Sequence, residues 1–400
     1  MSFHSRPRSA HLATANIFDV ALEPAFDFGS EEYQSLQERS GTSAFQGSRW
    51  LGTLHREVAP ALAAEPVTVT ARERATGRLV LVLPLVRCRL NRLIYLEFAD
   101  FGVCDYLALV YDPGDTERLI SDATLPIRVS ALLAPFDVIS LTKLPSEDPV
   151  LKHLFPNSRR ARMRVSAHTV EWDASWAEWR LTKVNPSLRH ELDIKRRRLA
   201  KAGTPVFVLV KGESEIVQAF DALRRFRIDR FTARRANDVL DSHAVFSFYR
   251  QIAVDGAGSG TARTYCLYLS GEPVAVMFGL VHRRTFSLLL IGFDVIKYRR
   301  LSVGLLMIED TLRASNEYGD LSYDFTIGDY PFKAQFGAQS KPLYEWRLAR
   351  TIRGRLAVLA TEAVRETKRA LKPLVTSARR FRLSTRRRKI ANRSVTGLLG

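Results

Sequence analysis

The sequence of 400 residues has little cysteine and no long apolar segment. Its three cysteines, Cys88, Cys104 and Cys266, stand far apart with no CxxC or Cys/His pairing, which argues against a zinc site and against a disulfide framework. No apolar run approaches the roughly 20 residues that span a bilayer, and the N-terminus lacks the apolar core of a signal peptide. These absences predict a cytoplasmic protein that is neither secreted nor integral to a membrane, and that holds no metal.

Positive charge is in excess, and most of it lies at the C-terminal end. The net charge is +18 at pH 7, and residues 351–400 hold 14 Lys/Arg against Glu362 and Glu366, a net of +12. The helical pattern that begins at residue 352 stops near Pro373 and is followed by the basic run 379–393. Such an extension fits contact with an anionic membrane surface or RNA, or a solvated and partly disordered tail. DNA binding is not expected, because the charge left for the rest of the chain is unremarkable.

The remaining pattern predicts two globular domains, since 400 residues exceed what one hydrophobic core usually organises. Residues 18–144 mix short helical patterns with β-rich runs, and the proline-containing segment 145–170 predicts an irregular connection. Residues 171–350 combine helical patterns with hairpin-linked strands, which predicts an α/β domain with a mixed sheet. Similar content in the two parts suggests a twofold architecture, with residues 351–400 as a basic helical or disordered tail.

The segment "LLLIGFDVIKYRRLSVGLLMIEDTL" is the most informative junction of a strand with a helix. A buried strand runs to Asp294, a loop carries cations that include Arg299 and Arg300, and a helix begins near Ser302 with Gly304 in its first turn. Backbone N–H groups at a helix N-terminus, with small residues and cations nearby, form a site for phosphate or pyrophosphate. The alternative is an ordinary serine N-cap with a tolerated glycine.

A second segment, "YDFTIGDYPFKAQFG", follows that helix. It begins as a strand, turns at Gly328, Asp329 and Pro331, and places Lys333 between aromatic residues. A strand followed by a glycine turn and a cation is a common way to present polar groups at a sheet edge, where ligands bind. A solvated loop after a core strand is the alternative.

These residues resemble a known family. Arg299-x-x-Ser302-x-Gly304 is similar to the acyl-CoA pyrophosphate loop of the GNAT acyltransferase superfamily, usually Q/R-x-x-G-x-G/A, with serine in place of its first glycine. The segment 323–333 is similar to the "FDF-GxGD-x-x-YK-x-x-F" signature of a GNAT branch labelled after the cellulose-biosynthesis protein CelD and related to Fem-type aminoacyl transferases. Three more segments recur in that branch: 43–51, 105–110 and the basic helix 189–203.

The resemblance covers about residues 20–350 and implies a tandem pair of GNAT-like acyltransferase domains, the first degenerate. The second would hold acetyl-CoA, or another acyl-CoA, in a cleft between two strands that splay apart. The resemblance implies that the donor's pyrophosphate lies on one loop, formed by Arg299, Arg300, Ser302, Val303, Gly304 and Leu305.

Direct acyl transfer to an amine or hydroxyl needs a proton acceptor, donors for the oxyanion and a proton for the leaving thiolate. No Ser-His-Asp or Cys-His pattern is apparent, so we do not expect a covalent acyl-enzyme. Asp294 is the first candidate for the base and Asp329 the second, with capping and turn roles as their alternatives. Tyr330 would donate to the thiolate unless it is simply packed. Lys333 resembles a lysine of the Fem-type transferases that steadies negative charge, unless it is paired with Asp329.

The resemblance implies a sugar or cell-envelope polysaccharide precursor as acceptor, for example a small molecule or a sugar nucleotide. The basic helix 189–201 would contribute cations to such an acceptor, or form a solvated face. Two other functions stay open. One is a Fem-like transferase that uses aminoacyl-tRNA, with the tail on RNA phosphates. The other is an inactive accessory of a polysaccharide synthase, held at the inner face of the membrane by the tail.

Overall fold

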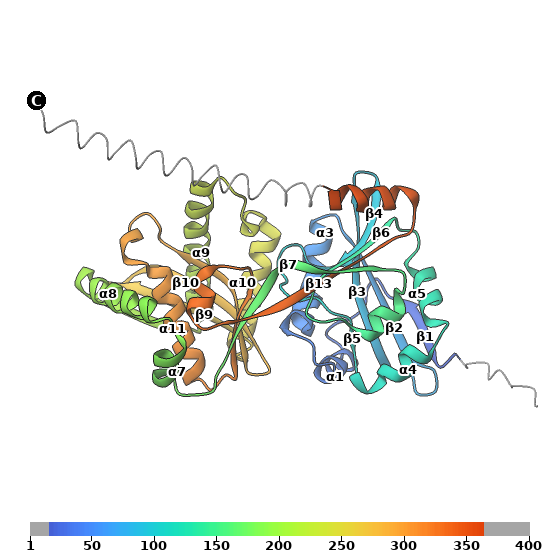
Figure 1. Ribbon diagram of the computed structural model, residues 1–400, viewed down its shortest axis with the longest axis horizontal. Helices are drawn as coiled ribbons and strands as arrows, with labels where there is room; N and C mark the ends of the chain where they lie inside the picture. The colour runs from blue at the N-terminus through green and yellow to red at the C-terminus, as the bar shows by residue number, and fades with distance from the viewer. Residues whose placement is uncertain (1–15, 364–400) are drawn as a thin grey trace, which may run out of the picture.

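The computed structural model describes residues 16–363, which form a single mixed sheet of 13 strands with helices on both faces (Figure 1). The strands are β1 (Phe18–Leu22), β2 (Glu65–Glu73), β3 (Leu79–Leu90), β4 (Leu93–Phe98), β5 (Val110–Tyr111), β6 (Val138–Leu144), β7 (Arg159–Glu171), β8 (Pro205–Val210), β9 (Ala262–Leu269), β10 (Glu272–His282), β11 (Thr285–Phe293), β12 (Ser322–Ile327) and β13 (Gln339–Ala349).

The α-helices are α1 (Glu31–Arg39), α2 (Ser48–Thr53), α3 (Ala59–Ala61), α4 (Thr116–Ser121), α5 (Leu125–Leu133), α6 (Pro149–Leu154), α7 (Trp176–Lys183), α8 (Pro186–Ala202), α9 (Glu213–Arg234), α10 (His243–Ala257), α11 (Val303–Glu317) and α12 (Pro331–Gln335). Residues 352–363 form a further helix. The predicted basic helix that ends at Gly203 is confirmed as α8. No helix in the described part of the chain is long and apolar enough to cross a bilayer.

Two groups of strands repeat the same arrangement. The sheet order is β1-β2-β3-β4-β6-β13-β7-β12-β11-β10-β9-β8, with β5 beside β3. In the first group β1 to β4 are antiparallel and β6 lies parallel to β4; in the second, β8 to β11 are antiparallel and β12 lies parallel to β11. The prediction of an α/β fold with mixed pairing is confirmed. The predicted domain boundaries stay predictions.

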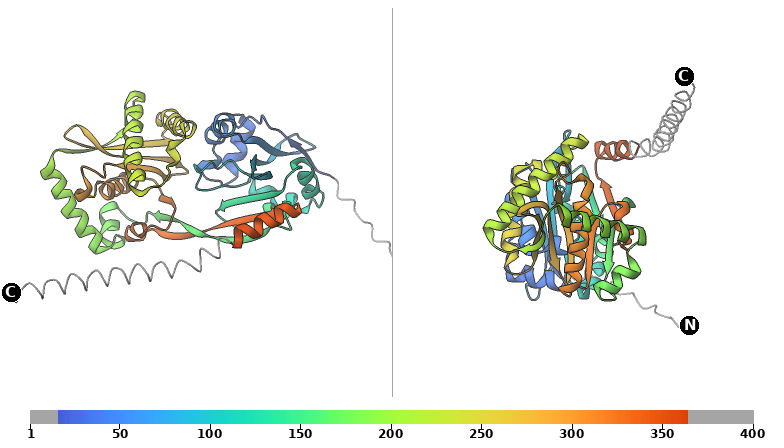
Figure 2. Two further views of the ribbon diagram at one scale, coloured as in Figure 1. Left: turned by 90° about the horizontal axis from the view of Figure 1, so that it is seen from above. Right: turned by 90° about the vertical axis from the view of Figure 1, so that its left-hand side faces the viewer.

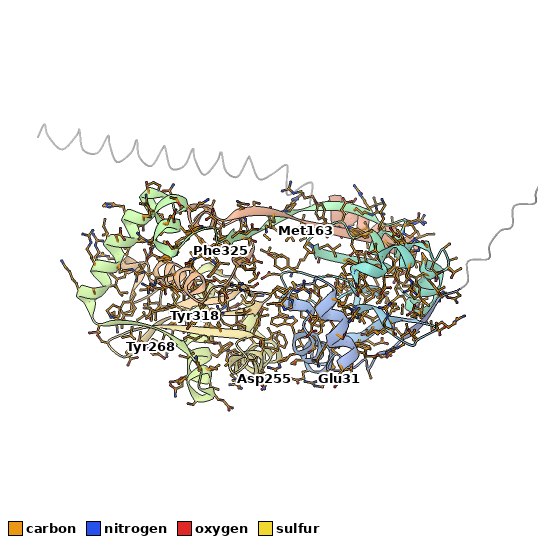
Figure 3. All side chains as sticks on the ribbon, turned by 90° about the horizontal axis from the view of Figure 1, so that it is seen from below. Glu31, Met163, Asp255, Tyr268, Tyr318 and Phe325 are labelled. Carbon is orange, nitrogen blue, oxygen red and sulfur yellow. The ribbon has the colours of Figure 1, made fainter. Side chains whose placement is uncertain are left out.

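Two central strands exchange partners between the groups. β7 follows the first group in the chain but pairs with β12 of the second, whereas β13 follows the second group and pairs with β6 of the first. The two strands also pair with each other, from Thr169–Gln339 to Arg159–Arg347. Figure 1 shows both crossing between the halves, and Figure 3 shows Met163 of β7 at the crossing.

The irregular connection predicted for 145–170 is therefore wrong, because this segment contains α6 and most of β7. The segment "RRARMR" is too polar to look like a buried strand. Its arginines nevertheless recur at every second position from Arg160 to Arg164, which is the period of a strand. The aliphatic stem of arginine packs along a sheet while its charge stays accessible. Arg160, for example, places its guanidinium 4.9 Å from the ring centre of Trp346 on β13.

The core explains how the helices are placed. On β9 and β10, Cys266 and Phe278 face the cluster that contains α9 and α10, whereas Tyr265 and Met277 face the cluster that contains α8 and α11. Alternate residues of one strand thus serve two helical layers, as expected for a sheet buried on both faces. Figure 2 shows the two halves side by side above the crossing strands.

The apolar run 106–111 is one of the β-rich runs of residues 18–144, but only Val110–Tyr111 of it forms a strand, β5. The residues before it leave the sheet as a loop, and this loop reaches the second group of strands. Residues 364–400, which include most of the predicted basic tail, lie outside the described residues.

Replacing Trp346 tests the crossing strands. The side chain is 1% exposed, and removing a buried tryptophan side chain costs about 3–5 kcal/mol. We expect Trp346→Ala to lower the free energy of unfolding in urea by about that amount, and Trp346→Phe to lower it less. Ile127→Ala is the control, because Ile127 is 70% exposed. Equal losses for Trp346→Ala and the control would contradict the assignment.

Candidate active site

The candidate site lies where β11 and β12 stop pairing. The two strands pair in parallel at three positions, the last of which is Ser287 with Asp324. β11 runs on to Phe293, while the pairing of β12 with β7 is irregular between Asp324 and Ile327, where Thr326 has a φ of 58°. Carboxyl ends of diverging parallel strands are common ligand sites. The ladder thus ends where the resemblance implies that the strands splay apart, and the Thr326 hydroxyl still donates to the Leu288 carbonyl of β11 at 3.1 Å.

The loop after β11 leads into α11 through a left-handed residue. Ser302 has φ 51° and ψ 39°, and its side chain makes no capping hydrogen bond. Its carbonyl accepts from the Leu305 N–H at 2.9 Å, while the N–H groups of Val303 and Gly304 have no acceptor within the helix. An ordinary serine N-cap is excluded. The left-handed conformation also explains why the similar family loop has glycine at this position.

Two cations and one glycine complete the loop. Arg299 and Arg300 are exposed in a short 3-10 turn before Ser302. A Cβ on Gly304 would lie 2.7 Å from the ring of Phe293, so this glycine is required by the packing of α11 on the end of β11. The loop can present N–H groups and positive charge to an anion, while Gly304 allows the close approach of strand and helix.

Asp294 ends β11 and caps the loop that follows. Its Oδ1 accepts from the N–H groups of Ile296 at 3.0 Å and Lys297 at 2.7 Å. This is the capping role named as its alternative, and it fixes the path of the chain towards α11. A role as the base stays a prediction.

Lys333 lies on the short helix α12, and its side chain turns back under the end of β12. Only 3% of the residue is exposed, and Nζ donates to the carbonyls of Phe325 at 2.9 Å, Thr326 at 3.0 Å and Ile327 at 3.0 Å. Burial lowers the pKa of this ammonium to about 8. Nearby carboxylates, of which Asp105 has the largest effect, raise the pKa and so oppose part of this shift. Because an ammonium has three N–H donors, contact with an oxyanion would require Lys333 to release a carbonyl.

The other two predicted residues of this segment lie nearer the surface. Asp329 Oδ1 accepts from His168 Nε2 at 3.0 Å and from the Ser166 N–H at 3.2 Å, which ties the turn to β7. The hydrogen bond from His168 holds the pKa of Asp329 below its usual value, so this carboxylate is a weak base. Tyr330 is 58% exposed and stacks on Phe332. Catalytic roles for Asp329 and Tyr330 stay predictions.

Two residues that the sequence did not single out reach the cleft from the first group of strands. The Tyr106 hydroxyl donates to the carboxylate of Asp324, and Asp105 interacts with the Thr326 side chain. Burial raises the pKa of Asp105 to about 6, although the charge of Lys143 acts in the opposite direction. Burial also raises the pKa of Asp324. Carboxyl groups from both halves of the chain therefore meet at the end of β12.

The loop that carries Asp105 is held from two sides. Lys143 Nζ lies 2.7 Å from Asp100 Oδ2 and donates to the Cys104 carbonyl at 2.6 Å. From α10 of the other half, the Tyr249 hydroxyl donates to the Val103 carbonyl at 3.2 Å. From the sequence, the segment 105–110 was noted only for its resemblance to the family. Its apolar residues have the pattern of a strand, so no site residue was expected there.

The basic helix α8 supports the loop at α11. Arg196 Nη2 bridges Glu309 at 2.6 Å and Asp310 at 2.8 Å, and Lys195 Nζ donates to the Arg300 carbonyl at 2.8 Å. Both carboxylates belong to α11 and are almost fully buried. These two cations therefore hold α8 against α11 and its preceding loop.

Comparison with known proteins fits this geometry. Residues 186–334, from α8 to α12, match the model of the acetyltransferase (GNAT) domain family. They form an acyltransferase domain of the GNAT type, and the predicted tandem GNAT-like fold agrees with the repeated strand arrangement. No curated protein matches the chain.

Two solved structures share the fold across most of the chain. One is FemX, with a TM-score of 0.55 and 11% identity, covering 83% of this chain and 97% of that one. The other is a conserved protein of unknown function from Bacteroides thetaiotaomicron, with a TM-score of 0.52 and 9% identity, covering 83% of this chain and 100% of that one. Identities this low show a common fold alone.

The left-handed serine gives a first test of the loop. A residue with a side chain costs about 1–2 kcal/mol in this conformation, so Ser302→Gly should raise the free energy of unfolding by up to about 1 kcal/mol. Ser302→Val should lower it. Ser187→Gly, at an exposed position in α8, is the control and should destabilise. Urea unfolding measures all three, and a destabilised Ser302→Gly protein would be inconsistent with the loop geometry.

The partly buried carboxyl group of Asp105 gives a second test, through pH. The pKa of Asp105 is about 6 in the folded protein against roughly 3.9 in an unfolded chain. The neutral Asp105 carboxyl therefore adds to the free energy of unfolding below about pH 4, and this contribution is lost as the pH rises through about 6. Asp105→Asn cannot ionise, so its stability relative to the unmodified protein should grow across that window and then level off.

Urea unfolding at stepped pH measures this difference. Asp221→Asn serves as the control, because Asp221 is exposed on α9. A difference between Asp105→Asn and the unmodified protein that stays constant with pH would rule out a raised pKa at Asp105.

Proposed function

We propose that the protein transfers an acyl group, acetyl in the first instance, from CoA to an amine or hydroxyl group. The observation that carries this proposal is that β11 and β12 stop pairing after Ser287 and Asp324, while β11 runs on to Phe293, against which the first turn of α11 packs. An extended thioester donor would lie along the end of β11, because Lys333 already occupies the three carbonyls at the end of β12.

The loop before α11 would bind the donor's pyrophosphate. The N–H groups of Val303 and Gly304 point out of the first turn, and the positive end of the helix dipole lies there. Arg299 and Arg300 add exposed positive charge on the same loop. Ser302 and Leu305 complete the turn by a hydrogen bond between their backbones. This chain would thus offer donors and cations to the pyrophosphate, and the end of β11 to the rest of the donor.

Asp105 is the group best suited to accept a proton. A carboxyl with a pKa of about 6 is ionised at neutral pH, yet it is a stronger base than an ordinary aspartate. In the proposed reaction the acceptor forms a bond to the acyl carbon while the carbon–sulfur bond breaks. The acceptor's proton passes to the Asp105 carboxylate, and the thiolate leaves to be protonated as the free thiol. Asp294 stays a second candidate at the end of β11.

Lys333 would act on the shape and potential of this site. Its ammonium donates to the three carbonyls at the end of β12 and so fixes the path of this strand beyond its pairing with β11. Its charge also favours the ionised forms of Asp105 and Asp324. Lys333 is therefore proposed as the residue that maintains the cleft, and an exchange of one carbonyl for an oxyanion belongs to the same proposal.

The acceptor is proposed to be a sugar or a cell-envelope precursor, on the resemblance of residues 323–333 to the CelD-like branch. The acceptor would enter between the two groups of strands, because Asp105 comes from the first and Asp324 from the second. The cytoplasm is the proposed location. A transferase that uses aminoacyl-tRNA would instead show salt-sensitive tRNA binding and no response to CoA.

Donor binding provides the test. Acetyl-CoA at a hundred times its dissociation constant should stabilise the protein by about 2.7 kcal/mol, seen as a higher melting temperature. Arg299→Ala combined with Arg300→Ala should lose most of this response, because the pyrophosphate loses its cations. The paired change is preferable to a larger residue at Gly304, which would displace Phe293.

Two controls separate the possible causes of a weakened response. Acetyl-pantetheine lacks the pyrophosphate, so it should stabilise the double variant and the unmodified protein equally. Arg56→Ala with Arg74→Ala removes two other exposed charges, whose side chains are 69% and 54% accessible, and should leave the response to acetyl-CoA intact. If millimolar acetyl-CoA does not stabilise the protein, the proposed function is wrong. If the Arg299/Arg300 double variant responds fully to acetyl-CoA, the pyrophosphate does not bind at this loop.

A further inference from the structure

The last described helix, residues 352–363, turns its apolar side to solvent. Ile352 is 77% exposed, Leu356 is 62% exposed and Leu359 is 58% exposed. Their spacing places all three on one stripe along the helix. We call these three residues the apolar stripe. Single exposed leucines are ordinary, but a stripe of three large side chains on one helix face marks a contact surface.

The opposite side of this helix is attached to the sheet by polar and backbone contacts. The Thr351 hydroxyl, just before the helix, donates to Asp137 Oδ1 at 2.5 Å. Gly354 lies directly against the Asp137 carbonyl, where a Cβ would clash. Further along the helix, Glu362 pairs with Arg159 of β7. A surface helix normally does the reverse and buries its apolar face, so this helix is fixed in place with the apolar stripe outward.

Positive charge flanks the apolar stripe. Arg353 and Arg355 are both exposed, and the helical spacing puts them on either side of it. The chain continues with residues 364–400, whose sequence holds 12 Lys/Arg against the single acid Glu366. Apolar residues bordered by arginines, with a strongly basic segment next in sequence, are the composition of a helix that lies in a membrane interface.

The apolar stripe and the positive charge around it together indicate which kind of partner this helix binds. RNA would satisfy the positive charge, but its unpaired bases stack on aromatic side chains, and the apolar stripe is entirely aliphatic. A second copy of this chain could cover the apolar stripe, but it would bring the same positive charge into contact with itself. An anionic lipid surface satisfies both features, because acyl chains accept the apolar stripe and headgroups attract the arginines.

We propose that helix 352–363 is a docking face for an anionic lipid surface, into which Ile352, Leu356 and Leu359 insert. The helix lies parallel to the membrane plane, and Arg353 and Arg355 contact the headgroups. The contacts with Asp137 and Arg159 transmit the docking to the rest of the molecule, so that the protein is held at the membrane without spanning it. Acyl transfer is not required for this role.

Vesicle co-sedimentation of the full chain tests the proposal. The vesicles contain phosphatidylcholine either alone or mixed with phosphatidylglycerol, at physiological salt of about 0.15 M. We expect binding to the mixed vesicles, and a loss of at least about tenfold when Ile352, Leu356 and Leu359 are all changed to serine. Because all three are exposed, the melting temperature should not change.

The matched control replaces three other exposed apolar residues, Ile127, Leu181 and Leu321, by serine and should bind as the unmodified protein does. Absence of binding to the mixed vesicles would overturn the proposal. Undiminished binding of the apolar-stripe variant would overturn it too, and would assign the attachment to the basic segment alone.

Two further measurements test whether the partner is a second copy of the chain or RNA. If the unmodified protein is a dimer without lipid and the apolar-stripe variant is a monomer in gel filtration, the stripe is a contact between copies and the proposal fails. If a single-stranded RNA oligonucleotide binds and the apolar-stripe changes abolish this binding, the partner is RNA and the proposal also fails. Unchanged oligomeric state and unchanged RNA response, together with lost vesicle binding, support lipid docking.

Discussion

The ladder between β7 and β13 is the constraint on which the other features depend. Each of these strands follows one half of the chain and pairs with the other half, so neither half completes its own sheet. The exchange brings the loop with Asp105 against β12 and supplies Ser166 and His168 to the turn at Asp329. The folding of one half therefore stabilises the geometry of the candidate site in the other half.

The cleft exists because β12 stops pairing with β11, and that interruption needs compensation. Carbonyls released from a sheet are costly to bury without donors. Lys333 provides those donors under the end of β12, and the nearby carboxylates offset the burial of its charge. A lysine in the interior, a positive φ at Thr326 and a raised pKa at Asp105 are connected consequences of keeping two strands apart.

Much of the second half could be predicted from its sequence. The period of its strands and helices, the loop before α11, and the strand and turn before Lys333 were all visible, because local pattern determines them. Three features were not. β7 was concealed by its arginines, the loop at Asp105 read as a strand, and Gly304 suggested a ligand although Phe293 explains it. In each case a contact in the folded protein, and not the local sequence pattern, decides the outcome.

The sequence by itself determined the class of fold, the position of the helix start at Ser302, and the concentration of positive charge at one end, since these follow from composition and short-range periodicity. Only the tertiary structure decided which groups meet. Asp105 and Asp324 lie more than two hundred residues apart in the chain, and their approach depends on strand pairing across the whole sheet. The outward direction of Ile352, Leu356 and Leu359 was likewise decided by contacts with Asp137 and Arg159, because an amphipathic pattern does not state which face is covered.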